Sequence, residues 1–304
     1  MKIALASSSL YALESLKALE QSKHEIVGFI SMPDRPQGRS AKAQPNPFRS
    51  WLSSERAGAP SFAPSSDEEL LQALTQMAPD LVVTLAYGRL VKEQALAAVK
   101  HGWLNIHFSI LPRWRGAAPV QRSLLAGESE SGVTVFKLDS GMDTGPIYSQ
   151  SSYRYGNDEC ATDALAEMAK LGAVQLIEAI GMINEGIDPK PQQGQMSLAP
   201  KIAKSELRLK LGSTSAQVMC QIRAFTKQPG VWFVFQGQRV IITKAKFSEF
   251  EVKVDHLVGG KDSLFLGTID GSIEIERVIP EGKREMSGGE FARGRDLTKA
   301  CPVE

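Results

Sequence analysis

Asn105 and His107 stand two residues apart at the end of a predicted strand, in the segment WLNIH. Residues i and i+2 of a strand point to the same face of a sheet, so both side chains should project together while Ile106 turns into the core. An imidazole can accept a proton near neutral pH, and an amide beside it can donate a hydrogen bond to a developing oxyanion. The pair therefore suits a reaction in which a proton is removed and a negative oxygen forms.

An acid that orients the imidazole is expected from the turn DSGMDTG, residues 139–145. The turn holds two aspartates, Asp139 and Asp143, and follows a predicted strand over 132–138. Either carboxylate can reach across to the histidine, and the residues alone leave the choice open. A histidine at a strand end and a glycine-rich turn are each more often structural than catalytic, so neither is specific by itself.

The elements that must position these residues alternate between aliphatic strands and amphipathic helices. Strands are predicted over 2–6, 25–31, 81–86 and 103–107, with helices over 10–19, 67–77, 90–99 and 161–187 and an antiparallel pair over 132–138 and 145–151. Such alternation predicts an α/β fold with a mostly parallel sheet, helices on both faces, and ligands beyond the carboxyl ends of the strands. We interpret 32–50, with its prolines, as a long loop.

The pattern changes after residue 200. The segment 188–200 is rich in proline and glutamine and has few large apolar residues, which is typical of a linker. Short alternating strands separated by glycine turns then predict a small β-barrel. We therefore expect a catalytic domain over 1–187, a linker over 188–204 and a barrel domain over 205–304.

The motif around the histidine extends into a longer signature. The pattern Asn105-x-His107-x-Ser109-Ile110-Leu111-Pro112, followed by RWRGAAP, resembles the signature of the folate-dependent formyltransferases, and the spacing to Asp143-Thr144-Gly145 matches as well. PDRPxGR at 33–39, AYG at 86–88 and APKI at 199–202 match too. The resemblance is strongest over 78–150 and weakens beyond 205.

The resemblance implies a Rossmann-like formyltransferase domain followed by an OB-like barrel. It implies Asn105, His107 and Asp143 as the catalytic residues, which decides between the two aspartates. His107 would be the base, and Asp143 would fix its tautomer. The implied donor is 10-formyltetrahydrofolate, the implied acceptor is the α-amine of methionyl initiator tRNA, and no metal is implied.

The resemblance also implies two sets of binding residues. The folate-binding set is Ser109, Ile110, Leu111, Pro112, Tyr87, Gly88, Arg89 and Leu90. The tRNA-binding set is Arg35, Arg39, Lys42, Arg49, Arg113 and Lys201. On composition alone, the basic stretch over 33–49 is a solvated loop, although loops this long are usually functional or disordered.

Composition limits the alternatives. The net charge is +1, so any nucleic-acid contact depends on local patches. The three cysteines lack zinc spacing, and no apolar run has the length of a membrane span or the form of a signal peptide. We expect a soluble, cytoplasmic protein, and nothing demands more than a monomer.

Two other functions compete with formylation of tRNA. One is an enzyme with the same three residues and another acceptor, either a sugar-nucleotide amine or water. The other is a non-catalytic RNA-binding module with a degenerate enzyme domain. The family usually opens with Phe-Ala-Gly-Thr-Pro where this chain has Leu5-Ala6-Ser7-Ser8-Ser9, and residues 38–42 also depart from its pattern. Both departures concern acceptor recognition.

Overall fold

The computed structural model describes residues 1–36, 42–227, 229–295 and 297–304. Contacts divide the chain into two compact units, and we describe each by itself. The first comprises 1–119, 131–153 and 165–199, and the second comprises 120–130, 154–164 and 200–304. The domain boundaries expected at 187 and 204 stay predictions.

The first unit is built on a seven-stranded sheet in the order β10-β9-β7-β6-β1-β2-β5. Its strands are β1 (Lys2–Ser7), β2 (Glu25–Ile30), β5 (Ser61–Phe62), β6 (Leu81–Leu85), β7 (Trp103–His107), β9 (Glu130–Lys137) and β10 (Ile147–Arg154). The pairings among β5, β2, β1, β6 and β7 are parallel, and β9 runs antiparallel to β7. The predicted α/β sheet, mostly parallel, is confirmed.

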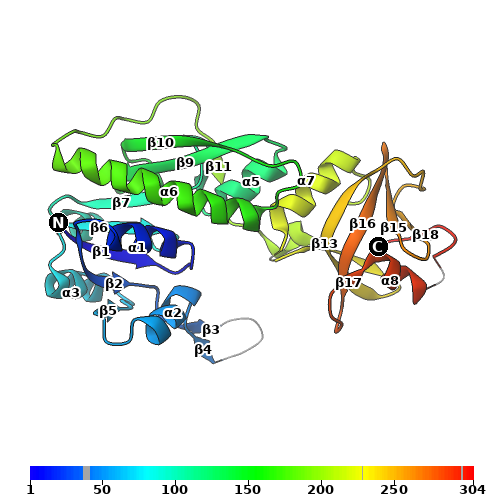
Figure 1. Cartoon of the computed structure of the whole chain (residues 1–304), viewed down its shortest axis with the longest axis horizontal. Helices are drawn as coiled ribbons and strands as arrows, with labels where there is room; N and C mark the ends of the chain where they lie inside the picture. The colour runs from blue at the N-terminus through cyan, green and yellow to red at the C-terminus, as the bar shows by residue number, and fades with distance from the viewer. Residues whose placement is uncertain (37–41, 228, 296) are drawn as a thin grey trace. The chain divides into compact units, whose positions relative to one another are not determined.

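Helices cover both faces of this sheet (Figure 1). They are α1 (Ala12–Glu20), α2 (Pro47–Glu55), α3 (Asp67–Met77), α4 (Glu93–Ala97) and α6 (Ala161–Asn184). Buried residues of α3 and α4 form one core cluster with Trp103 of β7, whereas Gly172 of α6 lies against Ile106. Trp103 and Ile106 therefore point to opposite faces, and Asn105 and His107 share the face of Trp103, as the alternation of a strand requires.

Three predictions about local structure were wrong. Part of the expected loop over 32–50 is helix α2, because Asn46 caps its N-terminus by accepting a hydrogen bond from Arg49 N, and Pro47 occupies a first-turn position that tolerates proline. The same stretch contains two short paired strands, β3 (Arg35–Pro36) and β4 (Ala43–Gln44). The helix expected over 90–99 is only α4, and the helix expected over 161–187 is α6, which ends earlier, at Asn184.

The second unit is a curled antiparallel sheet in the order β12-β13-β16-β15-β14-β18. The strands are β12 (Val231–Phe235), β13 (Gln238–Ser248), β14 (His256–Gly259), β15 (Leu264–Thr268), β16 (Gly271–Pro280), β17 (Met286–Ser287) and β18 (Cys301–Pro302). Glu304, after β18, exchanges two backbone hydrogen bonds of 2.9 Å with Val234 of β12, so the curl brings the last residues to the first strand. The barrel-like architecture predicted for this part is confirmed.

Helical elements were not predicted in the second unit. They are α5 (Pro119–Leu125), which lies in this unit from residue 120 on, α7 (Ser215–Phe225), α8 (Gly288–Arg293) and the 3-10 helix η1 (Lys204–Leu207). Phe291 of α8 is buried and packs 6.1 Å from Phe235 of β12, ring centre to ring centre. Within the described residues of both units, no helix is long and apolar enough to cross a membrane.

Candidate active site

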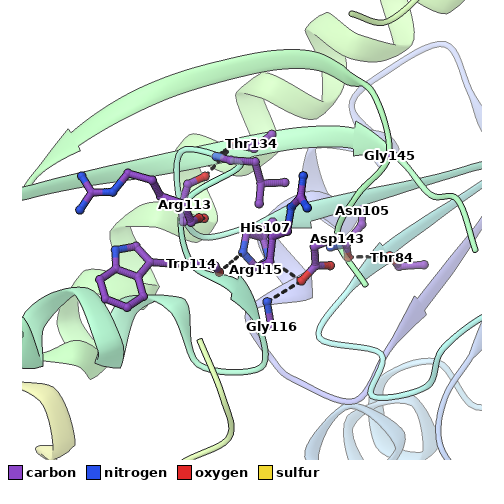
Figure 2. Close-up of polar contacts among 12 residues, drawn as sticks. Thr84, Asn105, His107, Arg113, Trp114, Arg115, Gly116, Thr134, Asp143 and Gly145 are labelled. Carbon is purple, nitrogen blue, oxygen red and sulfur yellow. Dashed lines mark hydrogen bonds and ion pairs between the residues drawn. The ribbon is translucent and has the colours of Figure 1, made fainter. Parts of the chain in front are cut away.

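Asn105 is oriented by a neighbour on the adjacent strand. Thr84 of β6 pairs in register with Asn105 of β7, so the two side chains lie on the same face. The Thr84 hydroxyl, which is buried, donates a 2.7 Å hydrogen bond to Asn105 Oδ1 (Figure 2). Because the amide oxygen accepts from Thr84, the Asn105 NH₂ is the group turned toward the site, in the orientation that an oxyanion donor needs.

His107 ends β7 and is held by a backbone carbonyl. Its Nε2 lies 2.8 Å from Trp114 O, and the ring is only 5% exposed. A carbonyl oxygen only accepts hydrogen bonds, so Nε2 carries the hydrogen and the lone pair of the neutral ring belongs to Nδ1. The atom available for taking a proton is therefore Nδ1.

Asp143 faces that lone pair. Its Oδ2 lies 3.7 Å from His107 Nδ1 and accepts a 2.8 Å hydrogen bond from Gly116 N. Figure 2 draws the side chains involved and these contacts. The distance to Nδ1 is longer than a hydrogen bond, so the Trp114 carbonyl and not Asp143 sets the tautomer. The expectation that Asp143 fixes the tautomer is corrected on this point, while the structure does bring Asp143 to His107.

Asp139 has a different environment. Its Oδ1 accepts hydrogen bonds from Thr144 Oγ1 at 2.6 Å and from Gly141 N at 3.1 Å. These contacts close the turn on itself, so this carboxylate has a structural part in shaping the loop that carries Asp143.

The loop 109–112 is tied into the first unit by its own polar groups. Thr134 Oγ1 donates to Ser109 O at 2.6 Å and accepts from Leu111 N at 3.1 Å. Gln150 Nε2 donates to Leu111 O at 2.9 Å, and Ser109 Oγ donates to Arg113 O at 2.6 Å. These hydrogen bonds engage backbone groups of Ser109 and Leu111 within the chain, and a folate contact by Ser109, Ile110, Leu111 and Pro112 stays a prediction.

The segment after β6 divides into buried and exposed parts. Tyr87 belongs to the core cluster below α3 and α4, its hydroxyl has no hydrogen-bond partner among the described residues, and burial raises its pKa to about 12. Arg89 donates to Pro64 O at 3.1 Å and forms an ion pair with Asp67. Gly88 has a positive φ of 88°, and Leu90 is 61% exposed. A folate contact by Tyr87, Gly88, Arg89 and Leu90 stays a prediction.

The residues expected to contact tRNA are spread over both units. Arg39 lies outside the described residues. Arg35 and Lys42 are exposed on and beside the β3–β4 pair, whereas Arg49 of α2 forms an ion pair of 3.2 Å with Asp34. Arg113 is exposed in the loop after 112, and Lys201 is exposed in the second unit.

Sequence reasoning did not identify Thr84, the Trp114 carbonyl or Gly116. A threonine at the end of a buried strand beside Asn105 was the one readable signal, because in-register neighbours of a parallel pair share a face. The other two contacts depend on the path of a loop. Among the residues that the structure describes, no group of three or more His, Cys, Asp or Glu side chains is arranged to hold a metal ion.

Comparison with known proteins gives family matches over most of the chain. Residues 1–180 match the family described as formyl transferase, and residues 201–296 match formyl transferase, C-terminal domain. Similar relatives are the methionyl-tRNA formyltransferases of Acidothermus cellulolyticus, 37% identical over 100% of both chains, and of Thermus thermophilus, 38% identical over 97% of this chain and 96% of the relative.

Solved structures share the fold at lower identity. HypX from Aquifex aeolicus is 18% identical, with a TM-score of 0.71 over 97% of this chain and 49% of HypX. The N-formyltransferase from Helicobacter canadensis, in complex with folinic acid and dTDP-3-aminofucose, is 20% identical, with a TM-score of 0.66 over 90% of this chain and 98% of that enzyme.

Proposed function

The chain belongs to the formyl transferase family, and from this premise we propose that it transfers a formyl group from 10-formyltetrahydrofolate to the α-amine of methionyl initiator tRNA. The observation that carries the proposal is that relatives named for this reaction match the chain from end to end, through both units. The arrangement of Asn105, His107 and Asp143 supports it, since these groups suit transfer of an acyl group to an amine.

His107 is the base of the proposed reaction. The α-amine must lose a proton as it bonds to the formyl carbon, and Nδ1 takes that proton because Nε2 is engaged by Trp114 O. The imidazolium then supplies a proton to the folate nitrogen whose bond to the formyl carbon breaks. One C–N bond forms, one C–N bond breaks, and one proton moves from the amine to the folate, so no oxidant, reductant or metal is needed to balance the step.

Asn105 and Asp143 stabilise the charges that this transfer creates. The Asn105 NH₂ donates to the formyl oxygen as that oxygen gains negative charge, and removing one such donor typically costs ~2.7–4 kcal/mol of transition-state stabilisation. The Asp143 carboxylate, 3.7 Å from Nδ1, stabilises the imidazolium while His107 holds the proton.

The exposed basic residues supply the acceptor side of the proposal. Arg35 and Lys42 beside the β3–β4 pair, and Arg113 in the loop next to the site, can contact phosphates of the acceptor arm. Phosphate contacts position the nucleic acid without reading its sequence. A near-neutral chain therefore needs these local charges to hold tRNA.

A panel of acceptors tests the proposed function. Purified protein is given 10-formyltetrahydrofolate with methionyl initiator tRNA, with a dTDP-amino sugar, or with water alone, and both formylated product and released tetrahydrofolate are measured. We expect formylmethionyl-tRNA, with folate release dependent on the charged tRNA. Formylated amino sugar, or folate release that ignores tRNA, would assign the same three residues to another acceptor.

A further inference from the structure

The segment before residue 200, expected as a linker, is fixed against the loop that carries the Trp114 carbonyl. Strand β11 (Leu198–Ala199) pairs in parallel with β8 (Arg115–Gly116). Ser197 accepts from Trp114 N through its Oγ and from Arg115 N through its carbonyl oxygen, both at 2.9 Å. These contacts lie within the first unit. They hold Trp114, whose carbonyl oxygen contacts His107, and Gly116, whose N–H contacts Asp143.

Gln192, in the same segment, connects two loops through a single amide. Its Nε2 donates to Asp143 O and to Gly145 O, each at 2.8 Å. Its Oε1 accepts from Arg115 Nε at 3.1 Å and from Arg115 Nη2 at 2.6 Å. The amide thus uses both of its N–H donors on one loop and its oxygen on the other.

The loop that receives the two donated hydrogen bonds needs such support. Asp143 has a φ of 54°, in the left-handed region where a non-glycine residue is strained. Strained backbone persists only where surrounding contacts hold it. Gln192 binds the carbonyl oxygens of Asp143 and Gly145, which flank Thr144. These two hydrogen bonds hold the backbone of the loop and so fix the direction of the Asp143 side chain.

We propose that Gln192 is a positioning residue for formyl transfer, which holds the Asp143 carboxylate at His107 by joining the 143–145 loop to Arg115. The inference rests on the proposed function, because the reaction that it positions is the formyl transfer described above. Gln192 acts through Asp143 and contacts neither substrate in this account. Its removal should slow the chemical step while leaving substrate binding in place.

The chemistry of the amide gives a discriminating pair of variants. Gln192→Glu keeps an oxygen for Arg115 but places a second carboxylate oxygen where the NH₂ meets two carbonyl oxygens. Gln192→Met keeps the length of the side chain and removes both sets of hydrogen bonds. Gln193 is the next residue and is exposed, so Gln193→Glu and Gln193→Met are matched controls for charge and side-chain change in the same segment.

The experiment measures kcat, KM for both substrates and melting temperature for all four variants, together with hydrogen exchange of peptides covering 139–146. For both Gln192 variants we expect kcat to fall about 10- to 100-fold, since a small misplacement of a catalytic group costs rate in this range. We expect KM values within twofold of wild type and faster exchange in 139–146. The Gln193 variants should match wild type in every readout.

Two results would overturn the inference. Wild-type kcat and unchanged exchange in Gln192→Glu would show that the amide does not hold the loop. A fall in kcat accompanied by a raised KM for both substrates and a lower melting temperature would show that Gln192 only contributes to packing of the fold. A wild-type protein that makes no formylmethionyl-tRNA would instead reject the proposed function, and the exchange of 139–146 would still decide whether Gln192 holds that loop.

Discussion

His107 keeps Nδ1 available for proton transfer because a main-chain oxygen holds its other nitrogen. A carbonyl cannot change its protonation state, so the Trp114 contact fixes the tautomer without adding another titrating group. Asn105 is oriented in a comparable way, by a hydroxyl buried on the neighbouring strand. At the scale of residues, His107 and Asn105 are therefore each oriented by an uncharged group.

Thr84 provides a test of this arrangement. Thr84→Val keeps the shape of the side chain and removes the donor to Asn105 Oδ1, so the amide is free to turn its oxygen toward the developing oxyanion. We expect kcat to fall about tenfold, which corresponds to ~1.4 kcal/mol of transition-state stabilisation. Steady-state kinetics and melting temperature for Thr84→Val and Thr84→Ser provide the check.

Thr84→Ser retains the hydroxyl and serves as the conservative control. It should keep kcat within about threefold of wild type, because the lost methyl group affects packing but not the hydrogen bond. If Thr84→Val retained wild-type kcat, or if the serine variant were the more impaired of the two, orientation of Asn105 by Thr84 would be wrong.

At the scale of elements, the sequence predicted features that depend on neighbouring residues better than contacts between segments that are far apart in the chain. Strand β7 was predicted with its observed bounds because its pattern lies within five consecutive residues, and its period of two placed Asn105 and His107 on one face. Helix α8 was missed because six residues are too few to show a helical period. The contacts of Trp114 and Gly116 were not predictable, because they depend on how β8 meets a segment about eighty residues later.

The opening strand illustrates the same limit. Ser7 to Ser9 depart from the family pattern, and nothing local indicated what the serines do. In the structure, Ser7 Oγ donates to Leu85 O at 2.6 Å and Ser8 Oγ donates to Tyr87 O at 2.9 Å. Ser7 and Ser8 therefore tie the end of β1 to the last residue of β6 and to the segment after it, contacts that are visible only in the folded sheet.

Gly116 gives a prediction at this scale. A Cβ at this position would lie 2.6 Å from Ala199 O, and the residue has a φ of 127°. Gly116→Ala should therefore separate β8 from β11 and displace the backbone N–H that donates a hydrogen bond to Asp143 Oδ2. We expect kcat to fall about 100-fold, the loss typical of a misplaced catalytic group, together with a lower melting temperature.

Gly194→Ala is the matched control for backbone strain. Gly194 has a φ of 107°, but an added Cβ would meet nothing within 4 Å. This variant should cost only the strain of a positive φ, about 1 kcal/mol of unfolding free energy, with kcat near wild type. Similar kinetics for the two alanine variants would contradict the account of β8 and β11.

At the scale of the whole molecule, charge decides how a near-neutral protein holds a polyanion. The net charge of +1 gives no general attraction for tRNA, so binding rests on a few exposed basic side chains. Several basic residues of the second unit are already paired on their own sheet. Lys244 lies 2.9 Å from Glu276, and Lys246 lies 3.1 Å from Glu274. The family resemblance places the tRNA-binding residues near β3 and β4, and we expect them to contribute more to tRNA affinity than these two lysines.

The double variant Arg35→Glu, Lys42→Glu tests that expectation. Losing two phosphate contacts should raise KM for methionyl initiator tRNA and reduce the dependence of log KM on log salt concentration by about one to two units of slope. KM for 10-formyltetrahydrofolate should stay unchanged. Kinetics between low and moderate salt measure both values, and Lys100→Glu, an exposed lysine outside the predicted tRNA-binding set, is the control. If the double variant and the control changed KM for tRNA and its salt dependence equally, Arg35 and Lys42 would not belong to the tRNA-binding site.

The central claim is that His107 transfers the proton as the formyl group moves to methionyl initiator tRNA. The most direct measurement is single-turnover formation of formylmethionyl-tRNA at saturating folate and tRNA by wild type, His107→Ala and the control His101→Ala. We predict product from wild type and the control, and a rate reduced about 10²- to 10⁴-fold in His107→Ala, the usual contribution of a general base. A His107→Ala rate within threefold of wild type would contradict the account.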